Sequence, residues 1–392
     1  MSSHFKKADR NGVALATAWP VVAALIGSLA LANPVEAAVF GKDDRTAVPQ
    51  RLDKVADKIG LLFNNQTRTV CSAFCIAENM IATAAHCMAR GKPKGSVRYE
   101  DFTFARRYGQ SRDFWKIEGA AAGAAEQSIM TGDFKLRVRP PIDAAHDWAI
   151  VRLQGKGCPG GGLPVRGLSS EELMQEAEAG KIYQISYHRD WAQWRPAYSK
   201  PCTISRDFDP VKWSQIAPDF LNPDNMILHT CDTGGASSGS PLLLDGPGGP
   251  AVVGINVGTY VLSRLVDVQR TGKSLPKQRA ETIANTAVNA QVFANRIDAL
   301  RTAVLLPNGK TMRELQERLR TLGHYSGATD SVYGSGLKSA IEAYEKAAQL
   351  PVTGLPTRSL LQRAGEDEAR SGGGQVTPSS ALPMQVPHSP QR

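Results

Sequence analysis

The sequence predicts a mainly β protein that ends in a small helical domain, and three observations support this. Short apolar or alternating runs recur between residues 69 and 257, and clusters of Gly, Pro, Asn and Asp separate them. The 392 residues include 36 Gly and 24 Pro, which suits a loop-rich β fold better than a helical bundle. From residue 311 the apolar residues adopt helical spacing instead.

The strands of the β domain are expected at the apolar runs, whose lengths are typical of a barrel or sandwich. These runs are Thr69–Ile76, Met80–Ala85, Ala149–Leu153, Ile182–Tyr187, Pro241–Leu244 and Ala251–Val257. Beyond them, Val288, Val292 and Ile297 lie near one face at helical spacing. We therefore expect a helix over residues 285–300 that packs on the β domain.

The N-terminus has the composition of an export signal. Lys6, Lys7 and Arg10 form a basic segment, and an apolar run follows over residues 13–32. Ala37 ends a short segment that a signal peptidase can read, so we expect a signal peptide over residues 1–37. The alternative is an uncleaved anchor, since the run is long enough to span a bilayer. Either way the folded part is expected outside the cytoplasm, in the periplasm or cell wall.

Charge and cysteine content narrow the function classes. The net charge of +9 suits an anionic surface, but basic and aromatic residues are not interleaved as in nucleic-acid-binding proteins. The six cysteines are an even number and fit disulfides in an oxidising compartment. They lack the paired spacing of a zinc site, and no H-E-x-x-H motif is present. We expect no metal and no cofactor.

The C-terminal part divides into a linker, a helical domain and a tail. Residues 306–310 form the linker, and the domain is expected over residues 311–364, after a β domain over residues 38–305. Apolar stripes predict its helices. Their members are Leu315, Leu319, Leu322, Leu337, Ile341, Tyr344 and Ala348. Residues 365–392 are rich in Gly, Ser, Pro and charge, so we expect a disordered tail.

Three residues in the β domain offer the groups that activate a serine. A serine hydroxyl is a weak nucleophile near neutral pH and needs a base, a carboxylate that orients the base, and backbone donors for the oxyanion. His86 lies in TAAHC, Asp147 opens DWAIVRL, and Ser238 lies in ASSGSP. Their rivals are His146, His188, His229, Asp143 and Ser237. None of the rival histidines has a comparable motif, and only Asp147 directly precedes an apolar strand.

TAAHC, the aspartate before a strand and SSGSP, in that order, resemble the motifs of trypsin-like serine peptidases. SSGSP and the segment VFGKDDRTAV resemble the bacterial branch that includes glutamyl endopeptidases. The resemblance implies a chymotrypsin-like double six-stranded β-barrel that hydrolyses protein or peptide substrates. It also implies an oxyanion hole formed by Ala236 and Ser238, and it fits a monomer. The alternative is a catalytically inactive fold of this type that serves as a wall-binding scaffold.

The resemblance also suggests how the cysteines pair. In trypsin-like enzymes a disulfide brackets the histidine strand, which implies the pair Cys71–Cys87. The pair Cys202–Cys231 would tie the strand before the serine loop. Cys75 and Cys158 then remain and pair only by elimination, which is weak because six cysteines allow 15 connectivities.

Two positions near the serine depart from the family pattern. Trypsin-like zymogens carry an Asp directly before the nucleophile to pair with a newly cut N-terminus, and here that position is Ser237. Activation by that ion pair is therefore not expected. The family often has Gly two residues before the serine, and here the residue is Ala236, whose Cβ restricts the backbone.

The resemblance places four residues near the primary specificity pocket. Asp232 lies six residues before Ser238, the offset at which trypsin selects Arg or Lys; alternatively it only holds its loop by hydrogen bonds. Thr233 is expected at the pocket wall, and Gly258 would keep the mouth open. Asn256 stands where glutamyl endopeptidases carry a His, so a preference for Glu is not expected.

The helical domain resembles the small three-helix peptidoglycan-binding domain of wall enzymes. The matching residues are Leu315, Gln316, Leu319, Leu322, Gly323, Tyr325, Asp330, Tyr333, Gly334, Ala340, Tyr344, Val352, Thr353, Gly354, Thr357 and Leu360. Ser331 stands where Gly often follows the Asp, and Glu345 where Gln often follows the aromatic. The resemblance implies peptidoglycan as a partner; the alternative is a helical domain kept for packing.

Overall fold

The structure is a computed structural model that describes residues 38–89, 98–110, 113–132, 135, 137, 139–270 and 273–372. The expected signal peptide lies outside the described residues, as does the part of the tail from residue 373. In the part that is described, none of the helices combines the length and apolar character needed to cross a membrane.

The first sheet is antiparallel, with the strand order β6-β5-β2-β3-β4-β8-β7. Its strands are β2 (Ile59–Asn64), β3 (Thr69–Ala77), β4 (Met80–Thr83), β5 (Phe102–Arg106), β6 (Trp115–Lys116), β7 (Ile129–Thr131) and β8 (Ala149–Arg152). Alternate residues enter two different apolar cores. Phe74 and Ile150 belong to one core, whereas Cys75 and Val151 belong to the other. Because both faces are buried, these strands have continuous apolar sequences.

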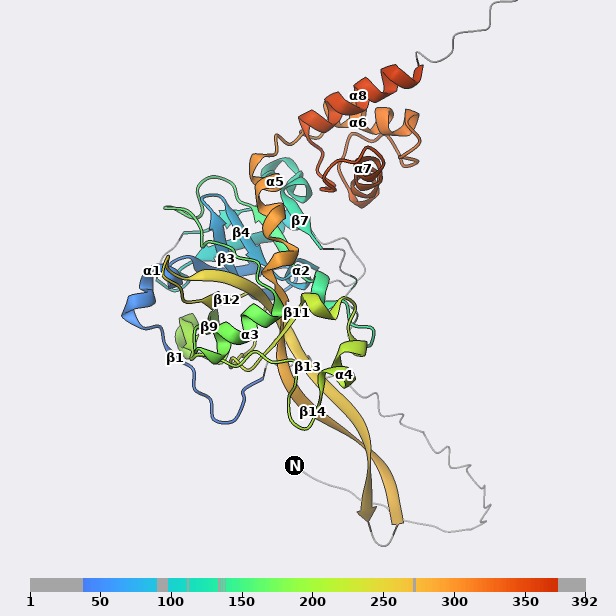
Figure 1. The fold of residues 1–392 in the computed structure, drawn as a ribbon. Helices are drawn as coiled ribbons and strands as arrows, with labels where there is room; N and C mark the ends of the chain where they lie inside the picture. Colours follow the sequence, from blue (N-terminus) through green and yellow to red (C-terminus); the bar gives the residue numbers. More distant parts are fainter. Residues whose placement is uncertain are drawn as a thin grey trace, which may run out of the picture. The chain divides into compact units, whose positions relative to one another are not determined.

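The second sheet is also antiparallel, with the order β1-β10-β9-β12-β13-β14-β11. Its strands are β1 (Thr46–Ala47), β9 (Ile182–Tyr187), β10 (Pro196–Ser199), β11 (Met226–His229), β12 (Pro241–Leu244), β13 (Ala251–Arg270) and β14 (Lys273–Asn289). Leu243 and Ile255 of this sheet belong to the same core as Phe74 of the first. The two sheets therefore share one hydrophobic core, and Figure 1 shows them adjacent.

The two curled sheets confirm the chymotrypsin-like fold. Each has seven strands where the resemblance implied six, and β1 and β6 are only two residues long. The helix expected over residues 285–300 is wrong in its first part, because residues 285–288 pair with β11. Helical turns begin only at residue 290, and α5 (Ile297–Thr302) follows.

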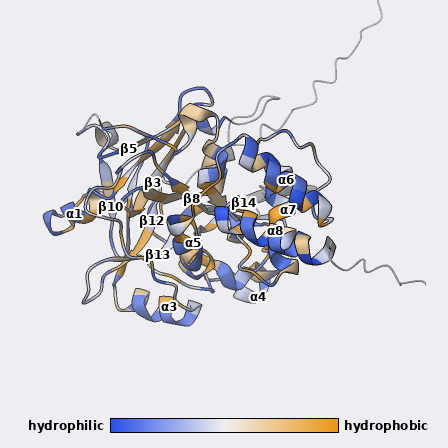
Figure 2. Ribbon diagram, turned by 90° about the horizontal axis from the view of Figure 1, so that it is seen from above, coloured by the Kyte–Doolittle hydropathy of each residue, from blue (hydrophilic) through white to orange (hydrophobic). Residues whose placement is uncertain are grey.

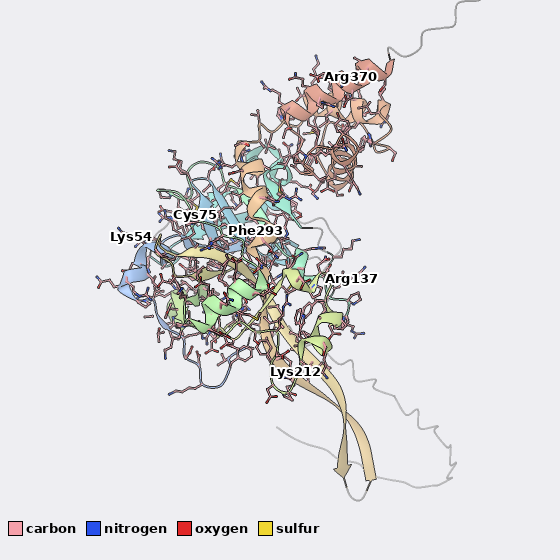
Figure 3. The ribbon with its side chains drawn as sticks, in the orientation of Figure 1. Lys54, Cys75, Arg137, Lys212, Phe293 and Arg370 are labelled. Atoms are coloured by element: carbon pink, nitrogen blue, oxygen red, sulfur yellow. A yellow bond between two sulfur atoms is a disulfide. The ribbon has the colours of Figure 1, made fainter. Side chains whose placement is uncertain are left out.

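Short helices connect the strands. They are α1 (Asp53–Ala56), α2 (Ala85–Ala89), α3 (Ser170–Glu178) and α4 (Trp213–Ile216). In Figure 2 the strands carry much of the orange colour, whereas α3 is largely blue. Phe293, marked in Figure 3, is fully buried, and its ring centroid lies 6.1 Å from that of Trp148. This contact anchors the segment before α5 beside the loop that carries Asp147.

Three helices form the C-terminal domain: α6 (Lys310–Thr321), α7 (Ser335–Ala347) and α8 (Arg358–Gly372). Their common core includes Leu315, Leu319, Leu337, Ile341, Tyr344 and Leu360. Helix α8 continues to Gly372, although a disordered tail was expected from residue 365. Asp367 explains the extension, because its carboxylate accepts from Tyr344 Oη at 2.7 Å and from Arg363 Nε at 3.1 Å.

Candidate active site

The pairing of β4 with β8 brings His86 and Asp147 together. Thr83 and Ala149 are partners at the end of this antiparallel ladder. His86 follows Thr83 by three residues in the first turn of α2, and Asp147 precedes Ala149 by two. Both residues therefore lie just beyond the same end of the ladder, although they are far apart in the sequence.

The Asp147 carboxylate holds His86 at two points. Oδ2 lies 2.6 Å from Nδ1 of the ring, and Oδ1 accepts from the His86 backbone amide at 2.7 Å. The exposed fractions of the two side chains are only 2% and 5%. The carboxylate thus fixes the ring orientation and makes Nδ1 the protonated nitrogen. Nε2 is buried and has no hydrogen-bond partner among the described residues, so it is free to accept a proton.

The turn that carries Ser238 packs against the strands around His86. The Ser72 amide in β3 donates to the Ser238 carbonyl at 2.9 Å, and Sγ of Cys87 lies 3.8 Å from that oxygen. Gly239 has φ +84°, and a Cβ there would lie 2.2 Å from both Ser72 O and Thr83 Oγ1. Only glycine permits this approach, which brings Ser238 next to the residue that follows His86.

Ser237 and Ser238 differ in environment. The Ser237 carbonyl accepts from Ser240 Oγ at 2.7 Å, and its hydroxyl accepts from Asn256 Nδ2 at 3.3 Å. Ser237 is buried, whereas Ser238 is half-buried and its hydroxyl has no partner among the described residues. Of the two candidates, only the hydroxyl of Ser238 is available to a substrate.

A network of buried hydrogen bonds supports the turn that carries Ser238. His229 Nε2 donates to Asn256 Oδ1 at 3.1 Å, and Asn256 Nδ2 donates to the Ser237 carbonyl at 3.2 Å. His229 Nδ1 accepts from the Cys231 amide, so the ring is neutral. Burial lowers the pKa of His229 to about 4. Asn256, which was expected at the specificity pocket, thus lies between His229 and the Ser237 carbonyl in this hydrogen-bond network.

His188 holds the residues before the turn in the same way. Its Nδ1 accepts from the Gly234 amide at 2.9 Å, and its Nε2 donates to Ser186 Oγ at 2.7 Å. Burial, and next the neighbouring positive charge of Arg45, lower the pKa of His188 to about 4. The sequence analysis treated His188 and His229 as rivals of His86, but the structure places both in supporting networks.

Ala236 has φ +80°, in the left-handed region that favours glycine. Its carbonyl accepts from Ser72 Oγ at 3.0 Å, which fixes the strained peptide. The Ala236 and Ser238 amides donate no hydrogen bond within the described part of the chain. Ser72 thus binds two carbonyls of the turn, while two amides of the same turn stay available. No motif in the sequence marked Ser72.

The four residues expected at the specificity pocket have different surroundings. Both oxygens of Asp232 accept backbone amides, from Phe40 at 2.8 Å and Asp44 at 2.9 Å. Thr233 Oγ1 accepts from the Ala38 amide at 3.0 Å. Asp232 and Thr233 therefore hold the first described segment against the second sheet. Gly258 is half-buried beside Thr286 on β13.

The remaining rivals have partners away from His86. Asp143 accepts from the backbone amides of Lys135 and Arg137 at 2.7 and 2.9 Å, so its carboxylate shapes a loop. His146 Nε2 lies 2.9 Å from Asn222 Nδ2. Neither residue competes with Asp147 or His86 for the site.

The cysteines pair as expected. The disulfides are Cys71–Cys87, Cys75–Cys158 and Cys202–Cys231. The first ties β3 to α2 directly beside His86. Cys71, Cys87 and His86 are close enough to suggest a metal site, but the two sulfurs are bonded to each other and cannot act as thiolate ligands.

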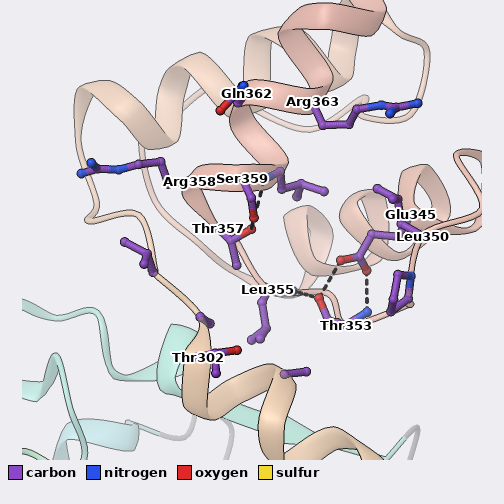
Figure 4. A pocket seen from close by; sticks show the side chains of 15 residues that line it. Thr302, Glu345, Leu350, Thr353, Leu355, Thr357, Arg358, Ser359, Gln362 and Arg363 are labelled. Carbon is purple, nitrogen blue, oxygen red and sulfur yellow. Dashed lines mark hydrogen bonds between the residues drawn. The ribbon is translucent and has the colours of Figure 1, made fainter.

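Glu345 and Ser331, the two residues that depart from the family pattern of the helical domain, each have a structural explanation. Glu345 accepts from the Thr353 amide at 2.6 Å and the Gly354 amide at 2.8 Å, and burial raises its pKa. Ser331 has φ +69°, which explains why glycine is common at this position. A groove of about 710 Å³ lies beside Glu345, with Arg358 and Gln362 also in its lining (Figure 4).

Comparison with protein families assigns both folded parts. Residues 57–264 match the family described as Trypsin, and residues 308–363 match the one described as a putative peptidoglycan binding domain. The two resemblances inferred from the sequence are thereby confirmed. Among solved structures, one described as "Structure of Glu endopeptidase in complex with MPD" is 15% identical, with a TM-score of 0.43. It covers 67% of this chain, which covers 99% of it. No curated protein gives a match.

Replacing Gly239 with Ala should disrupt the site. A Cβ would collide with Ser72 and Thr83, and the left-handed backbone adds strain, so we expect a loss of about 2–5 kcal/mol in unfolding free energy. The matched control is Gly235→Ala, because the nearest atom to a Cβ there is Arg189 Cβ at 3.6 Å. Urea unfolding of both variants tests this. Equal stability of the two would contradict the close approach.

The two buried histidines predict a pH-dependent stability. Free histidine has a pKa of 6.5, whereas His188 and His229 have values of about 4, so between these values the unfolded chain binds more protons. The unfolding free energy should therefore fall as the pH is lowered from about 6.5 to about 4, by about 3 kcal/mol for each histidine. Urea titrations at several pH values measure the slope. His229→Gln should flatten it, and an unchanged slope would refute the assignment.

Proposed function

Since the chain belongs to the trypsin family, we propose that it is an exported serine endopeptidase held at the cell wall by its helical domain. The proposal rests on one observation. The Asp147 carboxylate binds both the ring and the backbone amide of His86, beside the half-buried Ser238. His86 acts as the base, Asp147 orients it, and Ser238 is the nucleophile. The substrate is a protein or peptide, and the reaction needs no cofactor.

The proposed mechanism follows from the proton positions. The Asp147 carboxylate accepts a hydrogen bond from the Nδ1–H group of His86, which leaves Nε2 to take the proton of Ser238 Oγ. Oγ then attacks the scissile carbonyl carbon, and His86 returns the proton to the leaving amine as the peptide C–N bond breaks. Water, deprotonated by the same nitrogen, hydrolyses the acyl-enzyme and releases Ser238 with its proton.

The amides of Ala236 and Ser238 are the proposed oxyanion donors. Each of these amides shares a peptide plane with the carbonyl of the residue before it. The Gly235 carbonyl accepts from the Arg189 amide at 2.6 Å, and the Ser237 carbonyl accepts from Ser240 Oγ and Asn256 Nδ2, so both peptide planes are fixed before a substrate arrives. Donors that need no reorientation stabilise the developing negative charge best. Ala236 has a strained φ in this arrangement, and its buried surroundings stabilise that backbone conformation.

A preference for Arg or Lys is not part of the proposal. A pocket-floor carboxylate must face the cationic side chain, whereas Asp232 is 2% exposed and each of its oxygens accepts a backbone amide of residues 40–44. The other role left open in the sequence analysis, holding its own loop, fits the hydrogen bonds of Asp232 better. The same hydrogen bonds also hold the segment that begins at Ala38.

Location at the wall rests on three features. The N-terminal sequence has the composition expected of an export signal, and all six cysteines are paired, as suits an oxidising compartment. The peptidoglycan-binding family match supplies the partner. An inactive wall-binding scaffold is the alternative, and the intact Asp147–His86 pair argues against it.

Ser238→Ala should abolish labelling by a fluorophosphonate and hydrolysis of peptide substrates, because the attacking oxygen is gone. Asp147→Asn should lower kcat by about 10⁴-fold, since His86 would adopt the wrong tautomer. The matched control is Ser237→Ala, which should remain labelled. Inactivation by Ser237→Ala with activity kept in Ser238→Ala would reverse the assignment, and no labelling of the native protein would favour the scaffold.

The protein should co-sediment with purified peptidoglycan, and a form truncated after Leu306 should not, because it lacks the helical domain. Fluorophosphonate labelling of the truncated form checks that its β domain is folded. The binding should persist at high salt, which screens nonspecific attraction by the +9 net charge. Equal sedimentation of both forms would refute the role of the helical domain.

A further inference from the structure

Arg45 joins two segments of the β domain through a pair of carboxylates. Its Nε and Nη2 donate to Asp43 at 3.0 and 2.7 Å, and its Nη1 and Nη2 donate to Asp190 at 3.2 and 2.8 Å. Asp43 lies in the first described segment, whereas Asp190 follows β9. Hydrogen bonds from Arg45 lower the pKa of both carboxyls, so both are ionised. The guanidinium thus forms two bidentate pairs, and only 4% of its side chain is exposed.

The Arg45–Asp190 pair packs directly on Gly234, shortly before the turn that carries Ser238. A Cβ at Gly234 would lie 2.3 Å from Asp190 Oδ1 and 2.7 Å from Arg45 Nη1. A side chain at this position would therefore displace the ion pair. The pair and the backbone before the turn occupy adjoining space, with no atom between them.

Arg189 connects this ion pair with the amide of Ala236. The Arg189 amide donates to the Gly235 carbonyl at 2.6 Å, and that carbonyl belongs to the same planar peptide unit as the Ala236 amide. Asp190 is the next residue along the chain, and Arg45 binds its carboxylate at two points. The direction of a proposed oxyanion donor therefore depends on a segment that the ion pair holds in place.

A purely structural role for Arg45 explains this arrangement less well. The segment before it is already held by the side chains of Asp232 and Thr233, which accept three of its backbone amides. Burying a guanidinium costs desolvation free energy that its ion pairs offset only in part, so such pairs add little to stability. A strained backbone like that of Ala236, in contrast, persists only where its surroundings determine its conformation.

We propose that Arg45 and Asp190 are positioning residues, which hold the Ala236 amide in the direction that binds the oxyanion. They act through the hydrogen bond between Arg189 and Gly235 rather than by contact with the substrate. The inference rests on the proposed function, because an oxyanion forms only if the serine attacks a carbonyl. It makes catalysis depend on an ion pair that is part of neither the triad nor the turn.

The test compares the rate and the extent of fluorophosphonate labelling in the full chain. Arg45→Gln and Asp190→Asn should each lower the rate constant of labelling by at least about tenfold, since loss of an oxyanion donor costs about 10²–10³-fold. The kcat for a fluorogenic peptide that the native protein cleaves should fall in parallel, with KM nearly unchanged. The fraction labelled at the end of the reaction should stay as in the native protein. Misfolding would instead lower that fraction and leave the rate constant of the remaining molecules unchanged.

Three further variants separate positioning from stability. Arg45→Lys should restore only part of the rate, because an ammonium keeps the charge but cannot form two bidentate pairs. Arg51→Gln is the matched control, since it removes an exposed ion pair to Asp245, and it should label at the native rate. Asp43→Asn removes the carboxylate on the same segment as Arg45, and it should lower the rate less than Asp190→Asn does.

The outcomes distinguish this inference from the proposed function. Labelling at the native rate in Arg45→Gln or in Asp190→Asn would overturn the inference alone. Equal losses in Asp43→Asn and Asp190→Asn would also overturn it, because the guanidinium would then only stabilise its own segment. A native protein that is not labelled would refute the proposed function and, with it, this inference.

Discussion

The close approach of the Ser238 turn to β3 is the constraint on which the site depends. Ser238 comes from the second sheet and His86 from the end of the first, so the two meet only where the sheets touch. Gly239 permits that contact, and Ser72 secures it through two hydrogen bonds to the turn's carbonyls. One short segment therefore positions Ser238 and joins the two sheets.

The polar groups beneath this turn explain why its strained backbone persists. A left-handed alanine costs free energy, and it survives only where its surroundings determine its conformation. His188 fixes the residues before Ala236, and the His229–Asn256 chain fixes the carbonyl after it. Because both imidazoles are neutral, each can donate with one nitrogen and accept with the other. Burial lowers the pKa values of both rings and so keeps them neutral. Each ring can then keep one donated and one accepted hydrogen bond.

Much of the fold could be predicted, and His86, Asp147 and Ser238 could be named as candidates, because their signals are local. A motif marks His86, and apolar runs mark strands buried on both faces. The supporting residues could not be found, since Ser72 and His229 stand in strands with no motif around them. The surroundings of Asp232 could not be predicted from its offset to Ser238. That offset carries no information on residues 38–44, whose backbone amides donate to the Asp232 carboxylate.

Strand β13 supports the Ser238 turn only with its first part. The backbone of Asn256 exchanges hydrogen bonds with Gly239 and Ser240, so this part of the strand is joined to the turn. Two register shifts follow, between Asn256 and Gly258 and between Tyr260 and Val261. Bulges bend a strand and increase its twist, which lets the later part of β13 leave the direction of the sheet while its first part stays with the Ser238 turn.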